Sequence, residues 1–296
     1  MSEWAQGTVV VLGAGGMLAC ELIPRMQEQT RSAGGKVLVW TKGELDITDR
    51  KLVLEQIGLA TPSVVINCAA YTDVDGCESN TAKAMKVNGE GPGYLAEACK
   101  AASALFVHFS TDFVFDGELR RPYRVDDEAH PLSAYGISKL EGERAIISRD
   151  CTFLIIRTSW LYGSHGRNFV EAILGKAERD EQLKVVSDQV GRPTYAPDLS
   201  DAAMRLLEAQ AGGIIHFANS GHCSWHEFAV EIIRQSGLRV PVGTLSSSEL
   251  GRPAKRPAYS VLDMSSYEKA ASATPRHWKD ALADFMRLRK STGQVV

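Results

Sequence analysis

A short apolar run followed at once by glycines opens the chain and constrains its fold most strongly. Residues 8–12 read Thr-Val-Val-Val-Leu, the composition of a buried parallel strand. Gly13, Gly15 and Gly16 follow directly, then Ala19 and a helical pattern. Glycines between a strand and a helix permit a tight turn, where a pyrophosphate approaches backbone amides at the helix N-terminus. This order favours a dinucleotide-binding βαβ unit over a plain turn.

Strands and helices alternate through the first half of the chain. Apolar runs at residues 36–40, 63–67, 105–110 and 152–157 predict four further strands, with helical patterns between them. The helical stretch 81–102 is expected to be interrupted by its glycines and proline. Such alternation indicates βαβ units and a parallel sheet. We therefore predict an α/β protein with a Rossmann-type doubly wound parallel sheet and a smaller C-terminal lobe.

The regular alternation stops after residue 157. Residues 168–179, 199–209 and 277–289 have helical patterns, and 213–217 reads as a strand that rejoins the sheet. The dinucleotide-binding domain is expected to comprise residues 1–157 and 189–217, and the substrate-binding lobe residues 158–188 and 218–296.

Two hydroxyls and a carboxylate end the fourth predicted strand, and a tyrosine and a lysine follow on the next predicted helix. Thr111 and Asp112 stand at the strand end, while Tyr135 and Lys139 are four residues apart and share a helix face. An ammonium near a phenol lowers the pKa of that phenol, and a nearby hydroxyl can hold the reacting oxygen. The grouping suits proton transfer to or from a carbonyl or alcohol, although the pair alone also fits an exposed helix face.

The residues after the second strand bear on the choice of cofactor. A carboxylate there would bind the ribose 2′-hydroxyl of NAD, but Thr41 and Lys42 occupy the position. A cation favours a 2′-phosphate, so we expect NADPH, with NADH as the alternative. Lys42 could also be a solvated loop lysine with no role in binding. The other expected cofactor contacts are Met17, Leu18, Asp46, Ile47, Cys68, Ala69, Ala70, Tyr71, Asn88 and Ser110, and the family resemblance described below adds Tyr135 and Lys139.

The composition argues against several classes of partner and site. A net charge of −3 gives no reason to expect nucleic acid or an anionic membrane. Without a long apolar run or a visible signal peptide, we expect a cytoplasmic monomer or homodimer. The six cysteines are scattered without a Cys-x-x-Cys pair, which predicts reduced thiols and no metal site. His222 and His226 have a zinc-ligand spacing, but Ser224 and Glu227 form a capping-box pattern and favour a surface helix.

Seven segments together resemble a known family. They are Gly13-x-x-Gly-x-x-Ala, Asn67-Cys-Ala-Ala-Tyr-Thr-Asp-Val-Asp, Ser110-Thr-Asp-Phe-Val-Phe-Asp-Gly, Tyr135-Gly-x-Ser-Lys-x-x-Gly-Glu, Arg157-Thr-Ser-Trp-Leu-Tyr-Gly, Asp188-Gln-x-Gly-x-Pro-Thr and Arg256-Pro-x-x-Ser-x-Leu-Asp. The set resembles the extended short-chain dehydrogenases and, more narrowly, the dTDP-4-dehydrorhamnose reductase family, over nearly the whole chain. Ala19 and Phe113 depart from a more usual glycine and tyrosine, and we expect both changes to be tolerated.

The resemblance implies a reaction and a role for each site residue. NAD(P)H would reduce the C4 ketone of dTDP-4-dehydro-L-rhamnose to give dTDP-L-rhamnose. Tyr135 would protonate the new C4 oxygen, Lys139 would bond the nicotinamide ribose and lower the Tyr135 pKa, and Thr111 would orient the ketone. The nucleotide-sugar would be bound by Thr72, Asp112, Trp160, Gln189, Arg252 and Arg256.

Other interpretations remain open. The protein could reduce or epimerise another nucleotide-linked 4-keto sugar, or act as a non-catalytic NADP-binding regulatory subunit. Trp160 could be plain core, and Asp188 and Gln189 could cap a loop. Arg252 and Arg256 suit a substrate diphosphate, but a solvated basic loop fits them equally.

Catalysis and regulation predict different surfaces. An enzyme requires the Trp160 segment, the 188–194 loop and the 252–260 loop to converge near Thr111 and Tyr135, in a cleft between two lobes. A regulatory subunit would instead expose a large apolar patch for its partner.

Overall fold

Six short strands pair in parallel to form the main sheet. The computed structural model describes residues 3–179 and 182–291, so the outermost residues of the predicted domain ranges and positions 180–181 lie outside the described residues. The sheet order is β10-β5-β4-β3-β1-β2. The strands are β1 Thr8–Leu12, β2 Lys36–Trp40, β3 Val64–Asn67, β4 Leu105–Thr111, β5 Phe153–Thr158 and β10 Gly213–His216. The predicted α/β class and parallel sheet are confirmed, including the late strand that rejoins the sheet beside β5.

The strand register brings the predicted site residues to one edge of the sheet. Leu12 pairs with Asn67, and Asn67 pairs with His108 on β4. Thr111, at the end of β4, pairs with Thr158 at the end of β5. Ligands of open α/β sheets bind outside the carboxyl ends of the strands.

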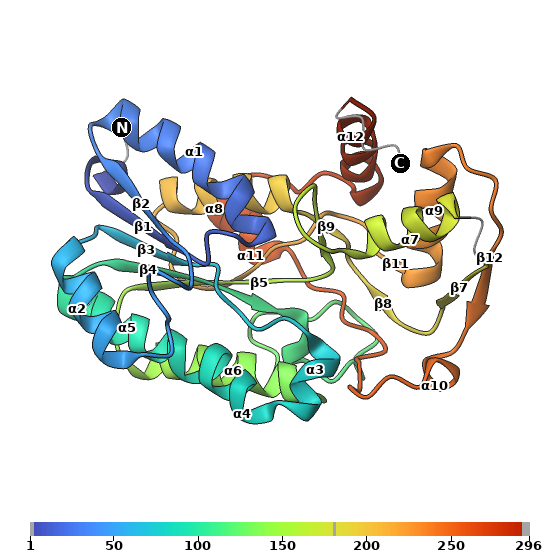
Figure 1. Ribbon diagram of the computed structural model, residues 1–296, viewed down its shortest axis with the longest axis horizontal. Helices are drawn as coiled ribbons and strands as arrows, with labels where there is room; N and C mark the ends of the chain where they lie inside the picture. Colours follow the sequence, from blue (N-terminus) through green and yellow to red (C-terminus); the bar gives the residue numbers. More distant parts are fainter. Residues whose placement is uncertain (1–2, 180–181, 292–296) are drawn as a thin grey trace.

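Helices cover both faces of the sheet (Figure 1). On one face lie α1 Met17–Ala33 and α8 Ala196–Glu208, and on the other α2 Arg50–Ala60, α5 Gly91–Ala102 and α6 Ala134–Ser148. Buried aliphatic side chains of the strands, such as Val9 and Val11, point to the first face, while Val10 and Leu12 join the core under the second. A strand buried on both faces therefore reads as the continuous apolar run seen in the sequence.

The helical stretch before α5 is not interrupted as expected. Helix α4 Thr81–Ala84 continues into a π-helical segment, Met85–Glu90, and then directly into α5. Pro92 stands at the start of α5, directly after the π-helical segment, and donates no N–H to the turn before it. The prediction of a break was wrong, because the glycines and the proline are accommodated inside one continuous helical path.

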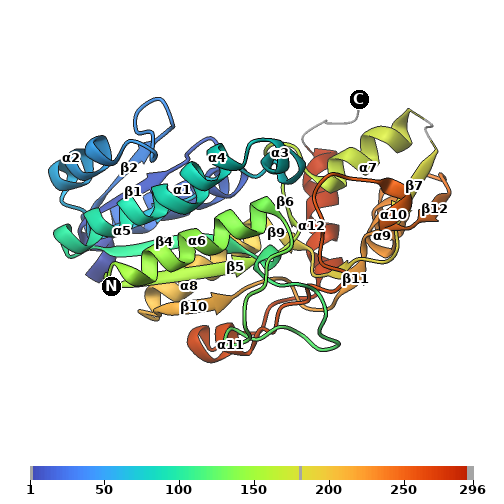
Figure 2. The same ribbon diagram turned by 90° about the horizontal axis from the view of Figure 1, so that it is seen from below.

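A second hydrophobic core lies beyond the sheet edge, at the right of Figure 1. Its members come from three separate parts of the chain, residues 162–195, 223–233 and 278–286. Figure 2 shows the helices of this part, α7, α9 and α12, beside the ends of the main strands. The remaining elements are η1 Glu3–Gln6, α3 Val74–Ser79, η3 Asp112–Val114, β6 Leu161–Tyr162, α7 Phe169–Glu178, β7 Leu183–Val186, β8 Val190–Gly191, β9 Thr194–Tyr195, β11 Cys223–Ser224, α9 Trp225–Ser236, β12 Val242–Leu245, α10 Ser247–Leu250, α11 Ser265–Ala271 and α12 Trp278–Ser291.

The predicted capping box forms at the start of α9. The Ser224 hydroxyl accepts the Glu227 N–H, and the Glu227 carboxylate accepts the Ser224 N–H. The ring of His226 bonds the Val242 carbonyl at 3.0 Å. Within the described residues, no three His, Cys, Asp or Glu side chains are grouped to hold a metal ion, all six cysteines are unpaired, and no helix is long and apolar enough to span a bilayer.

Candidate active site

Helix α6 begins against the short η3 turn that follows β4. Ser133 caps the helix by accepting the Gly136 N–H at 3.2 Å. A Cβ at Gly136 would lie 2.2 Å from the Phe113 carbonyl oxygen, so only glycine allows this approach. The same contact sets Tyr135 beside η3, and its ring meets that of Phe113 edge to face at 5.6 Å. The Phe113 departure from the family pattern is thus a packing partner of Tyr135.

Thr111 and Asp112 form a buried polar group at the end of β4. The Thr111 hydroxyl donates to Asp112 Oδ1 at 3.1 Å and accepts the Phe113 N–H at 3.2 Å. Ser260, from the 252–260 loop, donates to Asp112 Oδ2 at 2.5 Å. Burial raises the pKa of Asp112 to about 6, although these hydroxyls oppose the rise. The carboxylate that was expected to bind the sugar therefore anchors a distant loop instead of standing free.

Tyr135 is half-buried, and its surroundings do not lower its pKa as expected. Burial raises the pKa of the phenol well above its usual value, and the Thr111 hydroxyl opposes the rise. Lys139 is not among the causes that act on this pKa, and its Nζ contacts the Phe109 carbonyl and His108 Nε2 on β4. Tyr135 is therefore a neutral proton donor at neutral pH.

Lys139 is buried at the back of the site, with 2% of its surface exposed. Its Nζ donates to the Phe109 carbonyl at 2.7 Å and lies 3.0 Å from His108 Nε2. Burial lowers the pKa of Lys139 to about 8, and Glu143, one turn along α6, acts in the opposite direction. Glu143 is itself bonded to Arg157 of β5 at 2.7 Å, which ties α6 to the sheet.

The glycine turn after β1 fits a dinucleotide phosphate. Gly13 adopts φ +73°, and a Cβ there would meet the Ala69 nitrogen at 2.5 Å. Gly16 is the N-cap of α1 and provides no side-chain cap, while the space at the Gly15 α-carbon is open. Backbone donors at such a helix end favour an anion. At the end of β4, the Ser110 hydroxyl is buried and has no hydrogen-bond partner among the described residues, so it could bond a ligand.

The segment after β3 is fixed by two asparagines. Asn67 Oδ1 accepts the Ala69 N–H at 3.0 Å. Asn88, in the π-helical segment, accepts the Tyr71 N–H and donates to the Tyr71 carbonyl and to Ser138. Asn88 thereby joins the predicted cofactor segment to α6. Its side-chain amide already bonds Tyr71 and Ser138 of this chain. The wall from Cys68 to Tyr71 is held in place by these bonds.

The residues after β2 are only partly arranged as predicted. Lys42 is exposed and lies 3.6 Å from the Asp46 carboxylate. Ile47 is buried against Gly91 in the core, so its side chain belongs to the packing rather than to a cofactor surface. Leu18 likewise lies in the core under α1, and Met17 contacts Gly163.

Three loops expected to form the substrate side do meet one another. The Trp160 indole lies over Gly191, where a Cβ would be 2.5 Å from the ring, and it stacks on Trp225 at 3.6 Å. Val190 exchanges backbone bonds with Ala258 and Ser260. Because Ser260 also bonds Asp112, the chain of contacts runs from the Trp160 segment to the end of β4.

Three predicted substrate residues are placed differently from the expectation. Arg252 and Arg256 both pair with Asp75 of α3, at 3.2 and 3.0 Å, so this one carboxylate holds both guanidinium groups. The Gln189 amide donates to Ser247 of α10 at 2.7 Å, and Asp188 bonds the same serine. These bonds tie the loops to α3 and α10. Thr72, just before α3, is exposed.

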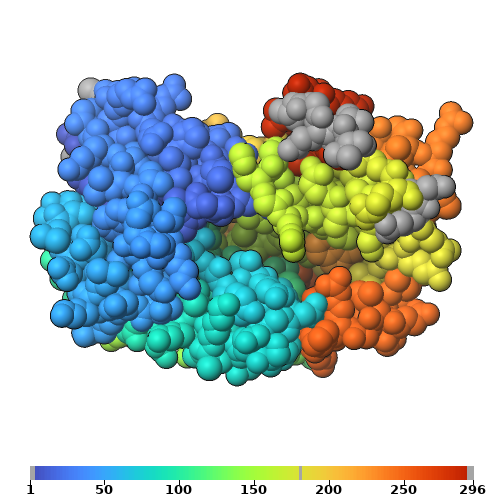
Figure 3. Space-filling model, viewed as in Figure 1, coloured from blue at the N-terminus to red at the C-terminus, as the bar shows by residue number. Residues whose placement is uncertain are grey.

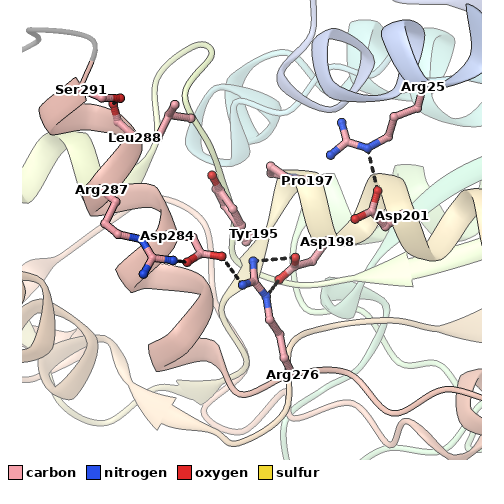
Figure 4. Close-up of a pocket in the computed structure, with 10 residues that line it drawn as sticks. All are labelled: Arg25, Tyr195, Pro197, Asp198, Asp201, Arg276, Asp284, Arg287, Leu288 and Ser291. Atoms are coloured by element: carbon pink, nitrogen blue, oxygen red, sulfur yellow. Dashed lines mark hydrogen bonds and ion pairs between the residues drawn. The ribbon is translucent and has the colours of Figure 1, made fainter. Parts of the chain in front are cut away.

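A hollow separates the two halves of the molecule. Figure 3 shows it between the blue and cyan surface of the N-terminal residues and the yellow-green and orange surface of later segments. A different hollow of about 790 Å³ lies beside α1, α8 and α12, and Figure 4 shows it lined by charged groups that pair among themselves, such as Arg25 with Asp201. None of the predicted site residues lines that second hollow.

The exposed apolar side chains are scattered. Among the described residues, the large ones lie on α2, α6, α9, α10 and α12, and they are Leu59, Ile137, Ile147, Val230, Leu250 and Leu288. Most of these helices contribute a single such side chain, whereas a docking surface gathers them in one patch.

Sequence reasoning missed three residues that organise the site. His108, Ser260 and Asp75 each contact a predicted site residue. His108 carried a signal, because a polar residue inside an apolar strand is buried with a partner. Asp75 and Ser260 stand in motifs that were recognised, but their partners lie far away in the chain.

Comparison with known proteins gives one consistent result. The family model for the RmlD substrate binding domain matches residues 7–290. The spore coat polysaccharide biosynthesis protein SpsK of Bacillus subtilis is 44% identical, covering 96% of this chain and 98% of the relative. A dTDP-4-dehydrorhamnose reductase of Streptomyces griseus is 41% identical over 96% and 94%. A dTDP-4-keto-6-deoxy-D-glucose reductase of Streptomyces niveus is 36% identical over 92% and 94%.

Solved structures agree with these sequence relatives. The dTDP-4-dehydrorhamnose reductase of Bacillus anthracis, solved in complex with NADP, has a TM-score of 0.91 at 32% identity, covering 95% of this chain and 99% of the other. The corresponding Clostridium acetobutylicum structure has a TM-score of 0.90 at 39% identity, covering 96% and 99%.

Proposed function

The chain belongs to the dTDP-4-dehydrorhamnose reductase family of NAD(P)H-dependent dTDP-sugar reductases, and we propose that it uses NADPH to reduce the C4 ketone of dTDP-4-dehydro-L-rhamnose to dTDP-L-rhamnose. One observation carries the proposal. Thr111 and Tyr135 lie against each other at the end of β4, with Lys139 behind them and Ser260 of the 252–260 loop bonded to Asp112 beside them. This is the arrangement that carbonyl reduction requires.

Each residue has a defined task in the proposed reaction. When bound, the reduced nicotinamide supplies the hydride for C4 of the sugar. Tyr135 donates its phenolic proton to the C4 oxygen as negative charge develops there. Asp112 and the Phe113 N–H hold the Thr111 hydroxyl in place. We expect the C4 oxygen to bind beside this hydroxyl. Lys139 presents its remaining N–H toward the nicotinamide ribose, since Phe109 and His108 hold its other side.

The glycine turn and the segment after β3 would hold the cofactor. The uncapped N-terminus of α1 suits the diphosphate, and Ser110 offers its unpartnered hydroxyl. The relative from Bacillus anthracis was solved with NADP, and Lys42 follows β2, where a cation would favour a 2′-phosphate. Both support the preference for NADPH over NADH.

A substitution of the proton donor tests the chemistry. Tyr135→Phe keeps the ring packing on Phe113 and removes the proton, so turnover should fall by roughly 10²–10⁴-fold while NADPH affinity stays near the parent value. Lys139→Ala should lower both turnover and cofactor affinity. Cofactor binding is measured by fluorescence and turnover by loss of nicotinamide absorbance. Full activity in Tyr135→Phe removes the residue from the role.

The sugar is tested with a substrate panel. Purified protein and NADPH are incubated with dTDP-, GDP- and UDP-linked 4-keto sugars, and the consumption rates are compared. The proposal requires dTDP-4-dehydro-L-rhamnose to be the fastest. The second candidate is reduction of another dTDP-linked 4-keto sugar, which the Streptomyces niveus relative favours, and a faster rate with that sugar would replace the first.

A further inference from the structure

A buried chain of polar side chains runs behind Lys139, away from the reacting atoms. Lys139 Nζ lies 3.0 Å from His108 Nε2, and His108 Nδ1 lies 3.2 Å from Asn67 Nδ2. Asn67 Oδ1 accepts the Ala69 N–H of the predicted cofactor segment at 3.0 Å. His108 and Asn67 are each 1% exposed, so water does not satisfy their groups. The chain therefore connects Lys139 to the wall that receives the cofactor.

The protons in this chain cannot all be satisfied at once. Asn67 Oδ1 is fixed on the Ala69 N–H, so the Asn67 NH₂ faces His108 and needs an acceptor there. A charged Lys139 also needs an acceptor on the other ring nitrogen. Burial and the neighbouring lysine lower the pKa of His108 well below its usual value, so the ring is neutral and has one acceptor nitrogen. Asn67 and the Lys139 ammonium compete for it.

We propose that Asn67 and His108 are positioning residues that favour the neutral amine of Lys139 by this competition. With Asn67 bonded to Nδ1, the ring proton lies on Nε2 and meets the lone pair of a neutral lysine. With Lys139 charged, the ring proton must lie on Nδ1 and oppose the Asn67 amide. The pair thus makes Lys139 a stronger acid than its packing alone would.

Other charged groups around Lys139 do not replace this effect. Glu143, on α6, favours the charged amine, but its carboxylate is bonded to Arg157 of β5. Tyr135, on the same helix face, is neutral because burial raises its pKa. On β4, His108 is the titratable group that contacts the amine, and the Phe109 carbonyl accepts from the same nitrogen. The proton balance at Lys139 is thereby set by Glu143 on one side and by the Asn67–His108 pair on the other.

Asn67→Asp tests the competition with a side chain of the same shape. An aspartate offers an acceptor to His108 Nδ1–H, which frees Nε2 for the ammonium. The Lys139 titration should move upward by at least one pH unit, a tenfold change in proton affinity. The readout is the pH dependence of NADPH binding, followed by fluorescence between pH 6 and 10, and the basic limb of kcat should move with it. The inference rests on the proposed contact of Lys139 with the cofactor, but the binding readout requires no sugar substrate.

A second background separates the tautomer from the added charge. Asn67→Asp is therefore also made in a His108→Phe background, where no ring tautomer exists. A through-space effect of the new charge would shift the Lys139 titration equally in both backgrounds, whereas the proposal requires most of the shift to vanish in the His108→Phe background. Nitrogen NMR of the His108 ring should show Nε2–H in the parent above pH 9 and Nδ1–H in Asn67→Asp.

Further outcomes decide the inference. Equal shifts in both backgrounds, or no shift at all, overturn it. If Asn67→Asp does not fold, Asn67→Ala serves instead, because it removes the NH₂ group that competes for His108 and should also raise the titration. NADPH binding that does not depend on Lys139 would instead remove the proposed cofactor role of that lysine, while the NMR result would still decide the tautomer question.

Discussion

The buried ion pair between Glu143 and Arg157 makes a demanding stability prediction. Its side chains are 2% and 4% exposed, and Arg157 donates from Nε to Oε1 at 3.0 Å and from Nη2 to Oε2 at 2.7 Å. Glu143→Ala removes both acceptors. The remaining neighbours of the guanidinium are His216 at 3.5 Å and the Phe115 ring at 5.2 Å. Arginine cannot shed its proton, so its charge stays buried and unpaired.

The expected loss is about 3–5 kcal/mol in the free energy of unfolding, the usual cost of leaving one member of a buried pair alone. Surface pairs contribute far less. The matched control is Glu141→Ala on the same helix, which breaks an exposed pair with Arg144 and should cost under about 1 kcal/mol. A third variant, Glu143→Leu with Arg157→Met, removes both charges and should regain most of the loss.

Urea unfolding followed by tryptophan fluorescence measures all three variants, with the midpoint and the slope reported separately. The reasoning fails if Glu143→Ala and Glu141→Ala lose the same amount, or if the double variant is less stable than Glu143→Ala. Removing the Glu143 charge should also lower the pKa of Lys139, because that carboxylate raises it in the parent protein.

Two further predictions follow from charges near the cofactor and the sugar. Lys42→Ala should weaken NADPH more than NADH, because the lysine would lie by the 2′-phosphate; equal weakening in a fluorescence titration would exclude that contact. Asp112→Asn should gain stability relative to the parent as pH rises. The parent carboxyl has a pKa raised to about 6 in the fold from about 3.9 when unfolded, so its favourable contribution is present below about pH 4 and is lost as pH rises through 6. Urea midpoints at pH 4.5 and 7.5 give the comparison, and a gap that does not widen with pH would contradict it.

The main sheet could be predicted because its signals are local. Each strand is a short apolar run, and Thr8–Leu12 and Lys36–Trp40 were bounded correctly to the residue. Tyr135 and Lys139 lie on the predicted helix, and their four-residue spacing predicts that they share one face of it. The predicted break in the helix at residues 81–102 was wrong, because tertiary packing accommodates the glycines inside a helix.

The contacts of individual side chains could not be predicted in the same way. Arg252 and Arg256 looked free for a diphosphate, yet their partner Asp75 stands some 180 residues earlier. The pKa of Tyr135 depends on burial and on the direction in which Lys139 points, and neither is encoded in the spacing of the two residues. The ion-pair partners and the pKa values depend on distances between side chains at the sheet edge, and these distances are set only when loops distant in the sequence pack together.

The second hydrophobic core is built from three stretches that alternate with returns to the main sheet. The chain leaves the sheet after β5, comes back for α8 and β10, leaves for α9, returns again at Tyr267 of α11 and ends in α12. A chimera with one junction, joining the first half of this protein to the second half of a relative, would therefore mix two parental sequences within the sheet core itself. Transplanting the second core intact requires at least three exchanged segments, so we expect properties that depend on this core to change by point substitution more readily than by recombination.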